Sequence, residues 1–169
     1  MGRFGSAAPR VETIVIGADH AGYHLKTFLK EELERLGYKV LDKGAFRFDE
    51  GDDYPDFIVP TVKEVLKNPL KTKAIIIGGS GQGEAMTANR FQGIRAVVFN
   101  GQYKPLDGRM VPHEIVISRQ HNDANVLALG ARFLSNEEAF HAVKLWLETP
   151  FSNDERHKRR LRKLENLTT

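Results

Sequence analysis

The sequence contains no cysteine among its 169 residues. This absence excludes disulfide bonds, metal sites built from thiolates and a cysteine nucleophile. The chain also lacks an apolar run of about 18 residues, so no transmembrane helix is expected. Residues 1–10 lack the apolar core of a signal peptide, and we expect a disordered N-terminus or a tag remnant there. We therefore expect a cytoplasmic protein in which residues 11–169 form a single domain with no membrane partner.

The charge is small overall and uneven along the chain. The formal net charge is +3, but residues 156–163 alone carry six positive charges. Such a basic cluster predicts an anionic partner near the C-terminus without identifying the anion.

Strand-like and helix-like patterns alternate along the chain. Short β-branched runs that end in glycine or polar residues predict buried strands, whereas apolar residues at helical spacing predict amphipathic helices. The alternation indicates an α/β fold with a parallel sheet covered on both faces, in which ligands bind beyond the carboxyl ends of the strands. The expected strands are 13–17, 38–41, 73–77, 95–99 and 125–129, and the expected helices are 19–37, about 54–68, 84–91, 137–147 and one from about 153.

A loop with four glycines, Gly78-Gly79-Ser80-Gly81-Gln82-Gly83, follows the third expected strand. Glycines permit close backbone approach, so the loop can direct several N–H groups at one anion, although a tight strand-to-helix turn is the alternative. Glu84 stands where a P-loop has lysine and where a dinucleotide loop has its third glycine. Binding of ATP or NAD is therefore not expected.

A carboxylate beside a set of N–H donors suits proton abstraction next to a carbonyl group. The carboxylate of Glu84 would remove a carbon-bound proton while the loop holds the enediolate oxygen. From residue type alone, the favoured explanation of Glu84 is an acidic residue stabilised by the dipole at a helix N-terminus.

Several segments together resemble the type B ribose 5-phosphate isomerases and the related galactose 6-phosphate isomerase subunits. The resemblance implies a three-layer α/β/α Rossmann-like fold with a five-stranded parallel sheet. It further implies a homodimer whose active sites use both subunits, and it leaves open whether two dimers pair into a tetramer. It also implies no metal, no organic cofactor and aldose–ketose isomerisation through a cis-enediolate. The segments are GADHAGYHLK (17–26), DYPDF (53–57), GGSGQGEAMTANRFQGIRA (78–96), SRQHNDANVLALGAR (118–132) and TPFSNDERHKRR (149–160).

The resemblance assigns the base. Some members use a cysteine at the first position of the glycine loop, which here is Gly78, and others use a glutamate after its last glycine, which here is Glu84. Because the chain has no cysteine, Glu84 is expected to be the base, with its pKa raised toward neutrality by the closed pocket.

Further roles follow from the same resemblance. His121 is expected to open the sugar ring, Asn122 to hold sugar or enediolate oxygens, and Ser80 to be catalytic. Simpler roles remain open: a helix-end surface histidine for His121, a helix cap for Asp19 and core packing for Tyr54. The expected substrate-binding residues are Asp19, His20, Tyr54, Gly79, Gly81, Gly83 and Asn122.

The substrate phosphate is expected to meet Arg132, Arg156, Arg160 and His20. The planar guanidinium binds phosphate oxygens in pairs, and positions 156 and 160 share one face of a helix. The alternatives are solvated charges or nucleic-acid binding, but no groove-reading pattern accompanies the cluster, so no nucleic-acid partner is expected.

The chain departs from the family between Arg95 and Arg119, where it is longer by about ten residues. We expect a surface excursion there, although Arg109 and His113 could reach a ligand. The substrate therefore stays open between ribose 5-phosphate and a six-carbon sugar phosphate such as allose or galactose 6-phosphate. A non-catalytic sugar-phosphate-binding module is the remaining alternative.

Overall fold

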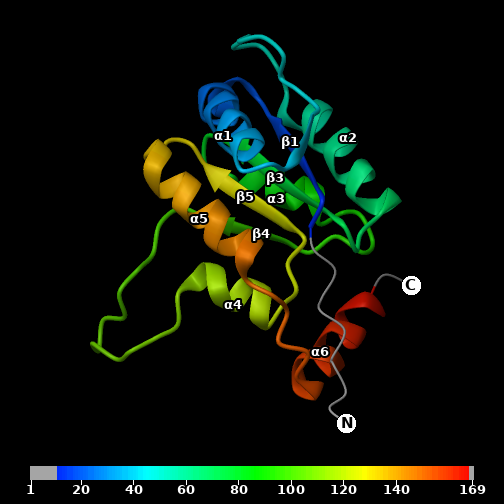
Figure 1. Cartoon of the computed structure of the whole chain (residues 1–169), viewed down its shortest axis with the longest axis vertical. Coiled ribbons are helices and arrows are strands. Elements are labelled where there is room, and N and C mark those ends of the chain that lie inside the picture. Colours follow the sequence, from blue (N-terminus) through cyan, green and yellow to red (C-terminus); the bar gives the residue numbers. More distant parts are fainter. Residues whose placement is uncertain (1–10, 168–169) are drawn as a thin grey trace.

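The computed structural model describes residues 11–167. Five parallel strands form one sheet in the order β2-β1-β3-β5-β4, and helices cover both of its faces (Figure 1). The structure thus confirms the predicted α/β class. Residues 1–10, for which we predicted disorder or a tag remnant, lie outside the described part. Across residues 11–167, the helices are all too short or too polar to span a lipid bilayer.

The boundaries of the elements follow the sequence pattern closely. The strands are β1 (Thr13–Ala18), β2 (Lys39–Asp42), β3 (Thr72–Gly78), β4 (Ala96–Phe99) and β5 (Val126–Gly130). The helices are the 3-10 turn η1 (His20–Gly22), α1 (Tyr23–Arg35), α2 (Tyr54–Lys67), α3 (Gln82–Ala88), α4 (Glu114–Gln120), α5 (Asn136–Glu148) and α6 (Glu155–Glu165).

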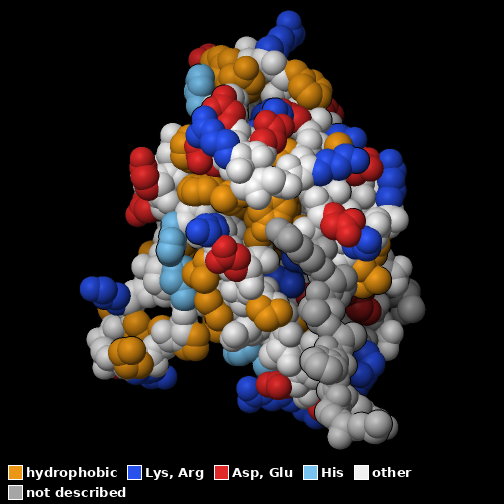
Figure 2. Space-filling view, in the orientation of Figure 1, with side chains coloured by type: hydrophobic (Ala, Val, Ile, Leu, Met, Phe, Trp, Pro, Cys, Tyr) orange, Lys and Arg blue, Asp and Glu red, His pale blue; other side chains and the backbone are white. Residues whose placement is uncertain are grey.

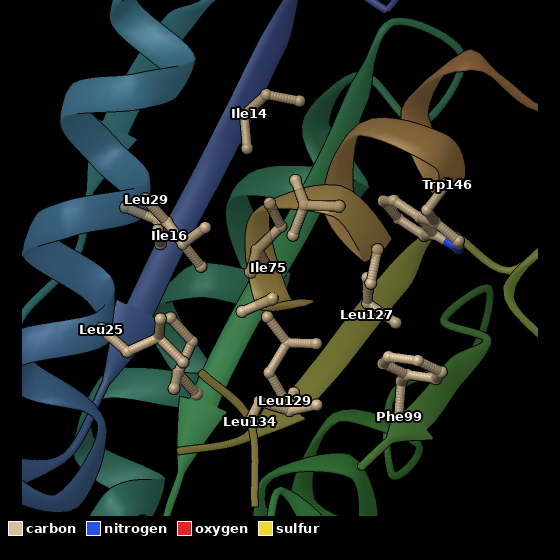
Figure 3. Packing of buried hydrophobic residues seen from close by; sticks show 14 of the residues in the cluster. Ile14, Ile16, Leu25, Leu29, Ile75, Phe99, Leu127, Leu129, Leu134 and Trp146 are labelled. Atoms are coloured by element: carbon tan, nitrogen blue, oxygen red, sulfur yellow. The ribbon is translucent and has the colours of Figure 1, made fainter. Parts of the chain in front are cut away.

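Two apolar layers lie on the two faces of the sheet. Successive strand residues point to opposite faces, so Ile14 and Ile16 enter one layer while Val15 enters the other. The first layer packs against α1 and α5, where Leu25, Leu29 and Trp146 meet the strand side chains (Figure 3). The second lies under α2 and α3. Because both faces are covered, the central strands β1, β3 and β5 carry continuous apolar runs rather than alternating patterns.

Two helices differ from the prediction. The helix predicted over 84–91 spans Gln82–Ala88, because Gly81 at φ 74° starts it earlier and Asn89 ends it. The helix α4 was missed. The glycines and prolines of the long segment 100–113 obscured its start, which is capped by the side chain of His113 through Nδ1 and the Ile115 N–H at 3.2 Å.

The segments that join strands to helices place the polar residues at two opposite edges of the sheet. Every strand is parallel, so all carboxyl ends lie at one edge and all amino ends at the other. The segments after β1, β3, β4 and β5 begin at the carboxyl edge. The segments after α4 and α5 begin at the amino edge, because these helices return antiparallel to the strands (Figure 1).

Candidate active site

The glycine loop joins β3 to α3 at the carboxyl edge. Every residue of β3 is buried, and its last residue, Gly78, pairs in register with Gly130 of β5. Gly81 adopts a positive φ of 74°, and a Cβ there would lie 3.1 Å from the backbone of Leu129. The chain therefore needs glycine at this position to turn sharply against β5 and enter α3.

The side chain of Glu84 points back from the first turn of α3 onto the end of β3. Glu84 is 4% exposed. A Cβ at Gly78 would lie 2.7 Å from Oε2 of Glu84 and would overlap Oε1. The carboxylate thus fills the space of a side chain at position 78. The resemblance assigns the base to position 78 or position 84, and a side chain at either position would occupy this same space.

Burial gives Glu84 the electrostatics of a base. Removal of the carboxylate from water raises the pKa of Glu84, and the nearby negative charge of Asp19 raises it further. The direction is the one predicted for a group that removes and returns protons near neutral pH.

Asp19 and His20 lie beside this carboxylate, after β1. Asp19 is buried and caps η1, since its Oδ1 accepts a hydrogen bond from the Gly22 N–H at 3.2 Å. His20 contacts Asp52, with 2.7 Å between Nδ1 and Oδ1, and this hydrogen bond is the main cause of the raised pKa of His20. Asp52 was not identified from the sequence, where it counted as part of a polar turn.

Asp19, His20 and Asp52 also have the composition of a metal site, with possible ligand atoms within 4.8 Å of one another. The contact with Asp52 uses Nδ1 of His20 and raises the pKa of the ring, so the arrangement can hold a positive charge on His20.

Two further predicted residues cover the glycine loop. A Cβ at Gly83 would lie 2.8 Å from the ring of Tyr54, and one at Gly79 would lie 2.9 Å from the guanidinium carbon of Arg132. Tyr54 is 37% exposed, so core packing does not explain it. Arg132 is exposed and follows β5. The aromatic ring of Tyr54, which precedes the loop in the sequence, and the guanidinium of Arg132, which follows it, thus both lie against the loop.

Asn100, which the sequence did not indicate as a site residue, contacts Ser80. The side-chain amide of Asn100 donates a hydrogen bond to the Ser80 carbonyl oxygen at 3.0 Å. The Asn100 Oδ1 atom is buried and has no hydrogen-bond partner among the described residues. Asn100 comes directly after β4, so this bond ties the start of the segment 100–113 to the glycine loop. A lone asparagine after a strand carries no signal by which it could have been found.

His121 and Asn122 lie at the opposite edge of the sheet. They follow α4 and precede β5, whose first residue, Val126, pairs with Ala74 near the beginning of β3. Glu84 lies beyond the other end of β3. The two groups are thus separated by the length of the strands, roughly 15 Å for five residues.

The basic helix α6 shares this amino edge. The ring of His157 lies 4.3 Å from that of His121, measured between centroids, and the Ser152 N–H donates to the Gln120 carbonyl at 3.1 Å. Arg156 and Arg160 are exposed on the same helix. His157, which had no predicted role, is buried, and its burial and the neighbouring His121 lower its pKa.

The predicted site residues therefore form two groups within one chain. The carboxyl-edge group holds Asp19, His20, Tyr54, the glycine loop, Glu84 and Arg132, and the amino-edge group holds His121, Asn122, Arg156 and Arg160. Arg109 and His113 belong to neither group, since Arg109 pairs with Asp107 on the surface and His113 caps α4. The fold defines an open α/β protein, a class in which ligands bind at the carboxyl ends of the strands, where the carboxyl-edge group lies.

Comparisons with known proteins agree with this class. The sequence model of the family described as Ribose/Galactose Isomerase matches residues 14–164. The chain belongs to this family. It is 36% identical to ribose-5-phosphate isomerase B of Mycobacterium tuberculosis over 149 residues, which cover 88% of this chain and 85% of the relative. It is 35% identical to a probable ribose-5-phosphate isomerase B of Mycoplasma genitalium, covering 89% and 92%.

Solved structures show the same fold. Ribose-5-phosphate isomerase B of Mycoplasma genitalium with bound ribulose-5-phosphate has a TM-score of 0.83 at 34% identity, covering 94% of this chain and 97% of that one. The enzyme of Clostridium thermocellum has a TM-score of 0.81 at 36% identity, covering 92% and 96%. The resemblance read from the segments is thereby confirmed, together with the five-stranded parallel α/β fold.

Proposed function

We propose that this protein interconverts ribose 5-phosphate and ribulose 5-phosphate, with Glu84 as the base. The observation that carries the proposal is the buried carboxylate of Glu84, which lies against Gly78 at the mouth of the glycine loop. The amino-acid sequence of this protein is 34–36% identical to those of several proteins named ribose-5-phosphate isomerase B. A sugar phosphate is the expected substrate class.

The chemistry requires one proton to move from C2 to C1 and another to move from O2 to O1. Glu84 takes the C2 proton of the open-chain aldose, the electron pair of that bond forms the C1–C2 double bond, and the π pair of the C1 carbonyl moves onto O1, which gives the enediolate. The protonated Glu84 then returns its proton to C1, the O2 proton passes to O1, and the electron pair left on O2 forms the C2 carbonyl of the ketose. The backbone N–H groups of residues 79–83, with Ser80, are the proposed donors to the enediolate oxygen, and one such donor is worth roughly 3–4 kcal/mol.

Cationic groups surround the proposed phosphate and sugar positions. Arg132 lies over Gly79, and His20 carries a raised pKa through its hydrogen bond with Asp52. Both can pair with an anion beside the loop. Asp19 and Tyr54 are proposed to contact sugar hydroxyls, which agrees with their positions next to Glu84 and Gly83.

The amino-edge group enters the reaction through a second copy of the chain. His121 and Asn122 lie a strand length from Glu84 of their own chain, too far to act on the same pentose. We therefore propose a homodimer in which His121 and Asn122 of one copy complete the carboxyl-edge group of the other, with Arg156 and Arg160 close to the phosphate. This arrangement makes both sites of a twofold dimer equivalent.

The test compares the isomerase activity of the wild type with that of Glu84→Gln on ribose 5-phosphate, with EDTA present. We expect activity in the wild type, and a loss of at least about a hundredfold in kcat for the variant. The kcat/KM of the wild type should fall as the pH drops through the raised pKa of Glu84, because protonation removes the base.

The stability of Glu84→Gln provides the control for misfolding. A carboxyl group with a raised folded-state pKa opposes folding once the pH exceeds its unfolded pKa, and this cost is complete above the folded pKa. The variant should therefore unfold no more easily than the wild type at neutral pH. Activity on a six-carbon sugar phosphate alone would change the substrate and keep the mechanism. Binding of sugar phosphates without turnover would indicate the non-catalytic module.

A further inference from the structure

The segment 100–113, which we name the arm, projects from the body of the molecule between β4 and α4 (Figure 1). Its apolar side chains point into solvent: Leu106 is 108% exposed, Met110 97% and Tyr103 72%. Apolar side chains gather at the far end of this projection (Figure 2). Exposed apolar groups clustered in this way mark an interaction surface rather than an ordinary loop.

The contacts of the arm are local. The Gly108 N–H donates to the Pro105 carbonyl at 3.2 Å, Arg109 pairs with Asp107, and Gln102 accepts from the Glu114 N–H at 2.7 Å. These bonds shape the arm without covering Leu106 or Met110. What covers them must come from outside the part of the chain that folds around the sheet.

The base of the arm is fixed beside the carboxyl-edge group. Asn100, the first arm residue, donates to the Ser80 carbonyl oxygen at 3.0 Å. The arm therefore starts next to the glycine loop and Glu84. Its 14 residues run out and back, so its tip can reach roughly 20 Å from this point.

A groove of matching character lies beside the amino-edge group. A cavity of about 310 Å³ is lined by Phe91, Ile94, Val97 and Leu164, with Asn122 among its lining residues. It lies at the beginning of β4, where α3 leads into the sheet and α6 passes close by. The groove is therefore fixed next to Asn122 and close to His121 in each copy, so a second copy that places these residues also places its groove.

We propose that the arm of each copy packs Leu106 and Met110 into the Phe91–Leu164 groove of a second copy. This inference rests on the proposed two-copy site: bringing Asn122 of one copy to Glu84 of the other also brings its groove within the roughly 20 Å reach of the other's arm. Twofold symmetry makes the contact reciprocal, so the arm of each copy packs on the other copy. The contact lies beside the proposed active site, to which both copies contribute residues. Leucine and methionine against an aromatic-lined groove form an apolar interface core.

Cysteine cross-linking tests this placement. Because the chain has no cysteine of its own, only the introduced cysteines can react. Gln92 is an exposed residue in the wall of the groove. We expect the double variant Leu106→Cys/Gln92→Cys to give a covalent dimer with a short bis-maleimide, and neither single variant to do so. Leu106→Cys paired with Leu70→Cys, which is 72% exposed between α2 and β3, should give none. No covalent dimer from the first pair, or a dimer from Leu106→Cys alone, overturns the placement.

Sedimentation and activity distinguish this contact from the two-copy site itself. Leu106→Ser/Met110→Ser should weaken dimerisation at least about tenfold, with activity recovered at high protein concentration, since two interface anchors are lost. Leu70→Ser, a matched exposed leucine, should leave the dimer unchanged. An unchanged dimer in the arm variant overturns the arm contact and leaves the proposed function standing. A wild type that is fully active as a monomer overturns both the arm contact and the two-copy site, while the isomerase activity itself stands.

Discussion

The space around Gly78 couples two residues six positions apart. The Glu84 carboxylate occupies the volume of a side chain at position 78, and its burial there raises its pKa. A glutamate base thus requires glycine at the first loop position, because both groups cannot share one volume. The presence of glycine, and not cysteine, at position 78 follows from this packing constraint.

This coupling predicts a specific defect for Gly78→Ala. The new methyl group should displace the carboxylate by about 1 Å or more and lower kcat by roughly a hundredfold, because a small misplacement of a catalytic group is costly. Steady-state kinetics measures the loss. Gly51→Ala is the control, since a Cβ there meets nothing nearer than 3.5 Å. Equal activity of the two variants would contradict the assigned position of the base.

Lys73 on β3 is a buried cation at the amino edge. It is 7% exposed, and burial together with the positive charge of Arg119 lowers the pKa of Lys73 from 10.5 to about 8. Below about pH 8 both the folded and unfolded states hold the proton, so the full cost of the buried charge opposes folding. Between about pH 8 and 10.5 the folded state loses the proton first, and stability rises with pH.

We therefore expect Lys73→Met to stabilise the fold at pH 7 by about 1–3 kcal/mol, with a gain that shrinks as the pH rises toward 10.5. Urea denaturation at a series of pH values measures it. Lys63→Met on the exposed face of α2 should change stability by less than about 0.5 kcal/mol at every pH. A destabilised Lys73→Met would mean that the ammonium makes a favourable contact in solution.

At the scale of the elements, an ionic network holds α6 against the sheet. Arg95, directly before β4, contacts Glu165 of α6 at 3.0 Å and Asp123, before β5, at 2.9 Å. The side chain of Arg95 is 19% exposed, so these contacts are partly shielded from water. The network positions the helix that carries Arg156 and Arg160.

Loss of this network should therefore affect both stability and substrate binding. We expect Arg95→Leu to lower the free energy of unfolding by about 1–3 kcal/mol and to raise KM more than it lowers kcat. Lys67→Leu removes an exposed pair with Glu64 and should cost less than about 0.5 kcal/mol. A normal KM in Arg95→Leu would show that α6 contributes nothing to phosphate binding.

At the scale of the whole molecule, the two halves of the site predict complementation between inactive variants. Glu84→Gln and His121→Ala should each be nearly inactive alone. When they are unfolded together and refolded as a mixture, half of the dimers are mixed, and each mixed dimer contains one intact site. About a quarter of the wild-type activity should return. No recovery from mixed dimers identified by mass would place both residues in one chain's site.

The fold and the glycine loop followed from local patterns, and the other carboxyl-edge residues followed from the family resemblance. Strand β3 carries a buried apolar run at residues 74–77, and the loop 78–83 shows its turn chemistry directly in its glycines. Asp52 and Asn100 were missed because a lone polar residue after a turn or a strand gives no local sign of its long-range partner. The helix α4 was missed for a related reason, since it is short and follows an irregular segment.

The sequence by itself determined the parallel α/β class and the position of a carboxylate behind the glycine loop, and the family resemblance predicted that this carboxylate is the base. The class and the position depend on side-chain period and on backbone freedom, which are local. The tertiary structure decided which residues share a site. His121 and Glu84 both stand in segments that carry the family resemblance, yet the return of α4 to the amino edge separates them by the length of a strand. Distances of this kind are set by how the helices pack across the sheet, and no local pattern encodes them.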